Sequence, residues 1–434
     1  MSSTDDTAIS TPVDIQEPKG TDGVRSQTSL EPKPPVTTKQ WLLVLSAFVV
    51  FLNTWGILLT FGVFQTYYEQ VLLPDRTASD IAWISTVSAF MMLFSGLITG
   101  TLFDYGYLRP LLFWGSLLEV FGLMMVSLST KYYQLFLAQG ICTGLGGGML
   151  YIPAIAAAAA GLQQFRRAKF IGLIASATGI GGVIYPIMFR RLVSPLGFPW
   201  TVRVIAFTMF GTFLMSYLTL IYKPQKNSLV RPLIDKAAFT DAGFLLLVLA
   251  GFFCSMAYYM PILYLPSFAE SKIPGFSAQN TDLAFYLVSI ANGTSVVGRL
   301  IAGAIATAIG PTETATLAAA SSSIILFLWI IVKSKTRMIV WTVFWGLASS
   351  VIVAMPGAMV PLFCPSLQVI GTRTGMFWAG VGIGVLIGCP VAGVLIDVKA
   401  AEIHWWQLQV FAGAIMTAGT LSFIYPVIQV RKTR

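Results

Sequence analysis

Twelve long apolar runs, each of 20 residues or more, follow one another from Trp41 to residue 428. They lie at residues 41–64, 81–103, 110–129, 133–157, 169–189, 200–222, 242–266, 282–306, 312–332, 338–363, 374–396 and 407–428. A helix of about 20 residues crosses the ~30 Å hydrocarbon core of a bilayer. In that medium the backbone must satisfy its own hydrogen bonds. We therefore expect an all-α membrane protein with twelve transmembrane helices.

The composition excludes most other classes of protein. Of the 434 residues, 56% are hydrophobic and only 10% are charged, whereas soluble domains contain about 25% charged residues. So few charges could not cover the surface of a soluble monomer, and the short loops leave no room for an enzymatic domain. The cysteines Cys142, Cys254, Cys364 and Cys389 lie far apart without CxxC spacing. We expect reduced thiols, no metal, no cofactor and no catalytic activity.

One polar break divides the apolar runs into two sets of six. It covers residues 223–241 and predicts a cytosolic linker between two six-helix halves, residues 41–222 and 242–428. Residues 1–40 contain five prolines, ten charged residues and no apolar core. We expect a disordered cytosolic tail there rather than a signal peptide, and a second short cytosolic tail at residues 429–434.

Lysine and arginine indicate the orientation, because the cytosolic loops of membrane proteins are enriched in both. With the N-terminus in the cytosol, sixteen of the 27 basic residues fall on the cytosolic side and ten on the other. This bias predicts that both termini are cytosolic. The remaining basic residue, Arg299, lies inside the eighth run. No long basic block accompanies the net charge of +9, so we expect no nucleic-acid partner.

The loop between the second and third runs pairs opposite charges across a turn. It reads Gly100-Thr-Leu-Phe-Asp104-Tyr-Gly106-Tyr-Leu-Arg109-Pro110. A carboxylate at the end of one helix and an arginine at the start of the next can form a charge-assisted clamp that holds and releases the helix ends. A plain charged turn is the alternative. The stretch resembles the signature loop of the major facilitator superfamily, and this resemblance implies a gating role for Asp104 and Arg109.

Four further segments resemble fungal members of the monocarboxylate-porter family. They are WGILLTFGVFQTYYE from Trp55, YQLFLAQGICTGLGGGMLYIP from Tyr133, FRRAKFIGLIASATGIGGVIYP from Phe165 and QVIGTRTGM from Gln368. The resemblance covers essentially everything after residue 40. It implies the major facilitator fold and a monomeric carrier, in the lipid bilayer, of a small organic anion or metabolite. It does not name the substrate, because the fungal relatives carry monocarboxylates, riboflavin or secondary metabolites.

A weak internal repeat relates the two halves. The fifth run places Arg167 before a Gly-Ile-Gly and a proline, and the eleventh run places Arg373 before the same pattern. Parallel six-helix repeats are the plan of the major facilitator fold, and we include Arg373 among the gating residues. The second-half copy of the signature loop has Thr307 and Ala308 where relatives often have Asp and Arg. We therefore expect the first-half loop to carry the cytosolic gate.

An arginine inside a bilayer helix needs a cavity or a partner. Asn292, Ser295 and Arg299 are spaced i, i+3 and i+7 and fall on one helical face. The guanidinium can grip a substrate carboxylate with two parallel hydrogen bonds. The alternative is a structural arginine that bonds to backbone carbonyls of a neighbouring helix. Animal members of the family have an Asp where this chain has Ser295, so the animal route of proton coupling is not implied.

Other polar and aromatic residues complete the predicted site. Tyr151, Tyr258 and Tyr259 lie on the fourth and seventh runs, which line the cavity in this fold, and Asn53 adds a polar group from the first run. A position at the membrane interface is the alternative for the tyrosines. Glu119 is the carboxylate nearest the middle of a run. We favour a packing, lipid-facing or protonated role for it, with proton relay as the alternative.

Small residues predict one close helix contact. Gly140, Gly144 and Gly148 recur at every fourth position and form a smooth stripe on one face of the fourth run. Such stripes allow two bilayer helices to approach closely. We prefer this interpretation to a phosphate-binding loop, because no lysine follows any of the glycines.

Together these features predict a secondary active transporter of a small organic, carboxylate-bearing solute, which works by alternating access. One alternative is an exporter of a fungal secondary metabolite. A less favoured alternative is a non-transporting nutrient sensor. Sensors usually carry a long cytosolic tail, whereas the tails expected here have 40 and about six residues. We expect a multi-pass protein of the plasma membrane, with the vacuolar membrane as the alternative.

Overall fold

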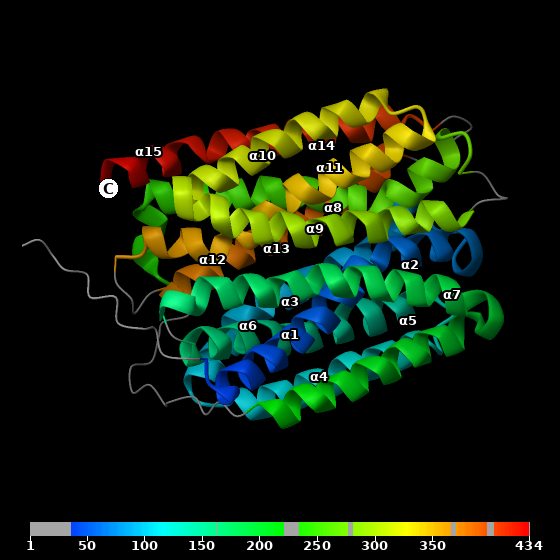
Figure 1. Ribbon diagram of the computed structural model, residues 1–434. Helices are drawn as coiled ribbons and strands as arrows, with labels where there is room; N and C mark the ends of the chain where they lie inside the picture. The colour runs from blue at the N-terminus through cyan, green and yellow to red at the C-terminus, as the bar shows by residue number, and fades with distance from the viewer. Residues whose placement is uncertain are drawn as a thin grey trace, which may run out of the picture. The chain divides into compact units, whose positions relative to one another are not determined.

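The computed structural model describes residues 36–162, 164–220, 234–276, 281–365, 370–396 and 403–433 (Figure 1). Every regular element in these ranges is a helix, and none is a strand, as the apolar runs predict. Residues 1–35 of the predicted tail lie outside this part of the chain. The first helix begins at Thr38, where the Thr37 hydroxyl accepts a hydrogen bond from the backbone N–H of Gln40 at 3.4 Å.

Two sets of helices follow the linker-based division of the chain. The first set comprises α1 (Thr38–Leu59), α2 (Phe61–Tyr67), the π-helix η1 (Tyr68–Leu72), α3 (Ala78–Asp104), α4 (Leu108–Val126), α5 (Tyr132–Leu135), the π-helix η2 (Phe136–Cys142), α6 (Thr143–Gly161) and α7 (Gln164–Thr219). The second set comprises η3 (Lys236–Thr240), α8 (Ala242–Lys272), α9 (Thr281–Ile309), α10 (Pro311–Leu328), η4 (Trp329–Ile331), α11 (Lys335–Ala354), α12 (Pro356–Met359), η5 (Val360–Phe363), α13 (Ile370–Ile396), α14 (Trp405–Ser422) and α15 (Ile424–Thr433). We call these sets the first and second halves.

Eleven helical stretches in the described ranges are long and apolar enough to cross a membrane. All but one correspond to a single predicted run. The exception, Phe170–Thr219, is 50 residues long and covers the fifth and sixth runs. Gly197 interrupts it with φ of 72° and ψ of 167°, a conformation that glycine adopts readily because it lacks a Cβ atom. The stretch is therefore two helices joined at a bend, and the described residues hold twelve candidate spans.

Helix ends differ from the predicted boundaries in two places, because polar residues outside the apolar runs also form helices there. The last span continues through α15 to Thr433, so the predicted tail at residues 429–434 begins inside a helix. The predicted linker at residues 223–241 contains the short helix η3 at its end. Asp241 then caps α8 by accepting a hydrogen bond from the Phe244 backbone N–H at 3.2 Å.

Each half is packed mainly on itself. In the first half α1 lies against α7, and α6 lies against α3 and α4. In the second half α8 lies against α13 and α14, and α9 lies against α11. Two seams join the halves, one between α3 and α13 and one between α7 and α9, and α2 contacts α8 at one end (Figure 1). Any space between the seams is thus bounded by both halves.

The predicted glycine stripe packs against α3. A Cβ atom built on Gly144 would lie 2.6 Å from the backbone oxygen of Ser88, and one on Gly140 would lie 3.2 Å from that of Ile84. Gly148 likewise lies against Ser95. Glycine is required here because the two backbones approach too closely for a side chain. The packing interpretation of the stripe is confirmed.

Gly144→Ala should therefore lower stability, because overpacking costs roughly 1–3 kcal/mol. Gly211→Ala is the matched control, since no atom lies within 4 Å of the added Cβ on this exposed position of α7. Thermal unfolding of the purified protein in detergent measures both changes. Equal melting temperatures for the two variants would contradict the close contact between α3 and α6.

Candidate functional site

A cavity lies between the two halves. It is small in this conformation, about 30 Å³, which is room for about two water molecules. Helices α1, α3, α8, α11 and α13 all contribute to its lining. The lining residues include Trp55, Tyr258, Tyr259, Val353, Phe377 and Trp378. Because walls from both halves meet here, relative movement of the halves would open the cavity.

The predicted tyrosines take two positions around this cavity. Tyr258 and Tyr259 line it directly. Tyr151 lies behind the wall, with its ring centroid 5.5 Å from that of Trp55 and 6.2 Å from that of Trp378. The sequence did not single out either tryptophan as a site residue. Hydropathy cannot distinguish an aromatic side chain that faces lipid from one that faces a cavity.

Arg299 is engaged in the seam between α7 and α9. Its Nη1 atom donates to the carbonyl oxygen of Ala175 at 3.2 Å and to the hydroxyl of Thr178, both on α7. Tyr258 lies near enough to interact with Arg299 electrostatically. Arg299 is buried, and it is not part of the cavity lining. These are the contacts expected of a structural arginine, and carboxylate binding by Arg299 stays a prediction.

Asn292 and Ser295 share the helical face of Arg299, as their spacing predicts. The Nδ2 atom of Asn292 donates to the carbonyl oxygen of Gly182 on α7 at 3.1 Å. The hydroxyl of Ser295 donates to the Asn292 carbonyl oxygen at 2.6 Å. A Cβ atom on Gly179 would lie only 2.7 Å from the Asn292 carbonyl oxygen. The polar face of α9 thus binds α7 of the other half rather than the cavity.

Asn53 belongs to a polar network inside the first half. Its Nδ2 atom donates to the hydroxyl of Thr212 at 2.9 Å, and its Oδ1 atom accepts from the hydroxyl of Tyr185. Both partners lie on α7, on either side of the bend at Gly197. Asn53 therefore ties α1 to both arms of α7, and its role in substrate binding stays a prediction.

Glu119 is buried between α4 and α6. A Cβ atom on Gly146 would lie 2.6 Å from the Glu119 backbone nitrogen, so the two helices touch at this point. The side chain is buried and does not face lipid. Its Oε2 atom has no hydrogen-bond partner among the described residues, and Tyr185 lies near enough to interact with it electrostatically. Packing is evident, whereas proton relay stays a prediction.

Polar contacts also join the halves where the first and seventh spans end. The hydroxyl of Ser267 on α8 donates to Oε2 of Glu69 at 3.4 Å, and Nε2 of Gln70 donates to Oε2 of Glu270 at 3.0 Å. The Nε2 atom of Gln65 donates a hydrogen bond to Oε1 of Glu69 at 2.5 Å. The sequence pattern did not single out these residues, although Glu69 and Glu270 both lie at the end of the first span of a half.

The signature loop is described in part. Arg109 donates from Nη2 to the carbonyl oxygen of Leu220 at 3.5 Å, which connects the start of α4 with the end of α7. The side chain of Asp104 lies outside the described residues. The predicted clamp between Asp104 and Arg109 therefore stays a prediction.

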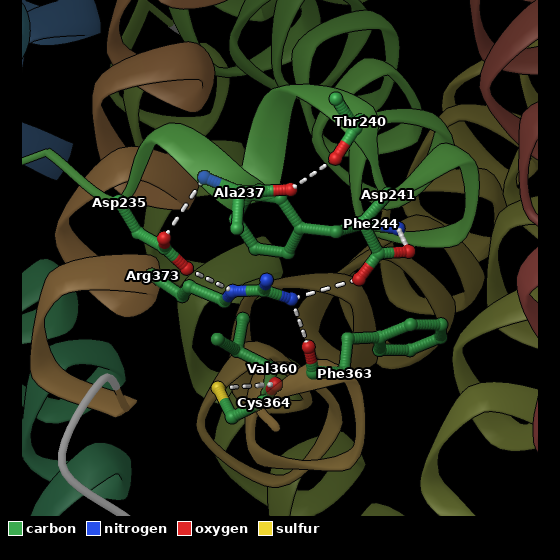
Figure 2. Close-up of polar contacts among 9 residues, drawn as sticks. All are labelled: Asp235, Ala237, Thr240, Asp241, Phe244, Val360, Phe363, Cys364 and Arg373. Carbon is green, nitrogen blue, oxygen red and sulfur yellow. Dashed lines mark hydrogen bonds and ion pairs between the residues drawn. The ribbon is translucent and has the colours of Figure 1, made fainter. Parts of the chain in front are cut away.

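Arg373 forms a second charged cluster, shown in Figure 2. Its Nε atom donates to Asp235 at 2.9 Å, and its Nη1 atom donates to Asp241 at 2.8 Å and to the carbonyl oxygen of Phe363. The guanidinium carbon lies 5.1 Å from the centroid of the Phe244 ring. Arg373 thus ties the start of α13 to the end of the linker and the start of α8.

Each carboxylate in this cluster also accepts a hydrogen bond from the backbone at a helix start. Asp235 accepts a hydrogen bond from the backbone N–H of Ala237, and Asp241 caps α8 (Figure 2). Both aspartates therefore fix helix starts and face the same arginine. Nearby, burial raises the pKa of the Cys364 thiol to about 11, so the thiol stays neutral beside the charges. The sequence pointed to Arg373 but not to its partners.

A chain of twelve spans in two sets, with a cavity between them, has the architecture of a membrane transporter. Residues 43–336 match the Major Facilitator Superfamily. The chain belongs to this superfamily. A solved structure of the nucleoside transporter NupG has the same fold, with a TM-score of 0.69 over 89% of this chain and 99% of that one, at 15% sequence identity.

Fungal transporters are similar over most of their length. The MFS-type transporter dbaD of Emericella nidulans is 37% identical over 373 residues, which are 86% of this chain and 82% of the relative. The aspyridones efflux protein apdF of the same species is 35% identical, over 91% of this chain and 79% of the relative. The fujikurins efflux protein of Gibberella fujikuroi is 33% identical, over 90% and 83%.

The cluster around Arg373 predicts an unequal response to charge removal. The side chain of Arg373 is 3% exposed, whereas those of Asp235 and Asp241 are 13% and 24% exposed. Combining Asp235→Asn with Asp241→Asn keeps both cap acceptors but leaves a buried guanidinium without a counter-charge. This should cost about 3–5 kcal/mol. Adding Arg373→Met should restore much of the loss.

Thermal unfolding of the double variant, the triple variant and Arg373→Met alone measures this coupling. Arg337→Met, which removes an exposed arginine, controls for the change of net charge. The cluster would be energetically unimportant if the three substitutions had simply additive effects.

Proposed function

We propose that this transporter exports a small organic metabolite by alternating access. The cavity carries the proposal, because helices of both halves line it and movement of the halves would enlarge it. Two relatives support export, because they are named as efflux proteins for aspyridones and for fujikurins. Membership of the branch that resembles monocarboxylate porters stays a prediction.

The contacts between the halves support a rocking mechanism. The seam between α7 and α9 depends on Arg299 and Asn292, and the end of the first span is held by the contacts of Glu69 and Glu270. Most of these are single hydrogen bonds, each with a net worth of roughly 1 kcal/mol. They can be exchanged for water as the halves separate. The ion pairs of Arg373 lie within the second half and need not break.

The orientation is part of the same proposal. With both termini in the cytosol, the contacts of Glu69 and Glu270 lie on the outer side, and the cluster of Arg373 lies on the cytosolic side. Export from a cell also requires the plasma membrane, and we propose that a monomer acts there. Twelve spans and the sixteen-to-ten bias of basic residues support this orientation.

Reporter domains inserted after Lys236 and fused to the C-terminus should both report the cytosol. The two sites are separated by six spans, so both must lie on one side. Fusions in two other loops are less informative because those loops are short: the one between α9 and α10 would be cytosolic too, and the one between η4 and α11 would be external. An external C-terminus would contradict the proposed twelve spans with cytosolic ends.

Export itself is tested in the organism that encodes the chain. Deletion of the gene should retain a small organic metabolite inside the cells and deplete it from the medium, as measured by mass spectrometry of both fractions. The wild-type gene should restore secretion. Depletion inside the cells would indicate uptake instead, and unchanged metabolites in both fractions would contradict a transport role.

Matched variants connect this phenotype with the cavity. Gly251→Leu should fail to restore secretion, because Gly251 lines the cavity and a Cβ atom there already lies 2.8 Å from the Phe377 ring. Val353→Phe fills the cavity from α11 and should act in the same way. Gly211→Leu adds the same side chain on an exposed position and should restore secretion. Immunoblots of membrane fractions verify equal amounts of each protein.

A further inference from the structure

The indole of Trp55 is an unsatisfied donor beside the cavity. Trp55 lies on α1, lines the cavity and is 4% exposed. Its Nε1 atom is buried and has no hydrogen-bond partner among the described residues. A buried donor without an acceptor is unfavourable, and such groups are rare in proteins. A ligand in the cavity that brings an acceptor would remove this cost.

The rest of the lining determines what kind of acceptor fits. No charged side chain lines the cavity in the described part of the chain. Arg299 is turned toward Ala175 and Thr178 on α7. An ionised carboxylate in the cavity would therefore lose its water without gaining a counter-charge, which is strongly unfavourable. A neutral carbonyl oxygen accepts a hydrogen bond without that penalty.

Aromatic rings determine the shape of the preferred ligand. Tyr258 and Tyr259 are packed edge to face with centroids 5.2 Å apart, and Phe377 and Trp378 are packed similarly at 5.7 Å. These pairs stand on α8 and α13 and both line the cavity. Aromatic side chains pack favourably against the faces and edges of other flat ring systems.

We propose that the cavity binds a flat, uncharged, conjugated molecule through a carbonyl oxygen that accepts a hydrogen bond from Nε1 of Trp55. This inference rests on the proposed function, since it specifies the substrate class of the same cavity. It replaces the carboxylate predicted from Arg299 with a neutral acceptor. The hydrogen-bond donor for the ligand then comes from the first half of the protein. The aromatic side chains that contact its flat faces come mainly from the second half.

Three naphthalene probes of similar size separate the chemistries. 2-Acetylnaphthalene carries a carbonyl group, 2-isopropenylnaphthalene replaces its oxygen with a CH₂ group, and 2-naphthoate carries a carboxylate. Calorimetric titration into the full chain in lipid nanodiscs measures affinity, with empty nanodiscs subtracted for partition into lipid. The ketone should bind ~3- to 10-fold more tightly than the alkene, the worth of one neutral hydrogen bond.

Trp55→Phe keeps the aromatic ring and removes only the donor, so it should abolish the preference for the ketone while retaining affinity for the alkene. Trp405→Phe is the matched control. Nε1 of Trp405 is also buried without a partner in the described residues, but Trp405 does not line the cavity. This variant should keep the preference. Thermal unfolding verifies that both variants fold.

Equal affinity of the wild-type protein for ketone and alkene would overturn the proposal, and this comparison needs no variant. Survival of the preference in folded Trp55→Phe would also overturn it. Tightest binding of 2-naphthoate, abolished by Arg299→Gln, would show a carboxylate site instead. Binding is measured without transport, so a failure here is distinguishable from a failure of the export experiment.

Discussion

Hydrocarbon offers no hydrogen bonds, and this constraint governs the polar groups in the described spans. Backbone groups are satisfied within helices. Many Ser and Thr side chains bond to carbonyls of their own helix, and several other polar side chains reach a neighbouring helix. Ser46 and Ser216 exchange hydrogen bonds between α1 and α7 at 3.0 Å. Arg299 and Asn292 reach backbone carbonyls of α7. The polar residues of the spans thus act as specific links between helices, and these links decide which helices move together.

The strength of those links differs within and between the halves. Within the second half, Arg373 has two carboxylate partners and a carbonyl oxygen. Between the halves, the contacts are mostly single hydrogen bonds to uncharged groups or to carboxylates near the membrane surface. Charged, buried pairs are costly to break, whereas single hydrogen bonds exchange readily with water. This difference is what alternating access requires, because each half must stay intact while the seams open.

The cavity differs from the seams in whether its hydrogen-bond donors have partners. The seams satisfy their donors, while the cavity leaves the Trp55 indole unsatisfied among aromatic walls. In the proposed binding mode, this donor would contribute specificity without a charged group to desolvate. Tyr258 lines the cavity and lies near Arg299, so it stands between the cavity and the seam of α7 and α9.

The sequence alone determined the helical class, the positions of the spans and the close packing of the Gly140–Gly148 stripe, because hydropathy and helical spacing are local properties. It also placed Asn292, Ser295 and Arg299 on one face. Only the tertiary structure decided what that face meets, and it meets α7 rather than the cavity. Asp235 and Asp241 lie more than a hundred residues from Arg373, and nothing local connects them. Contacts between distant helices depend on how the helices are rotated, which the apolar pattern of a span does not specify.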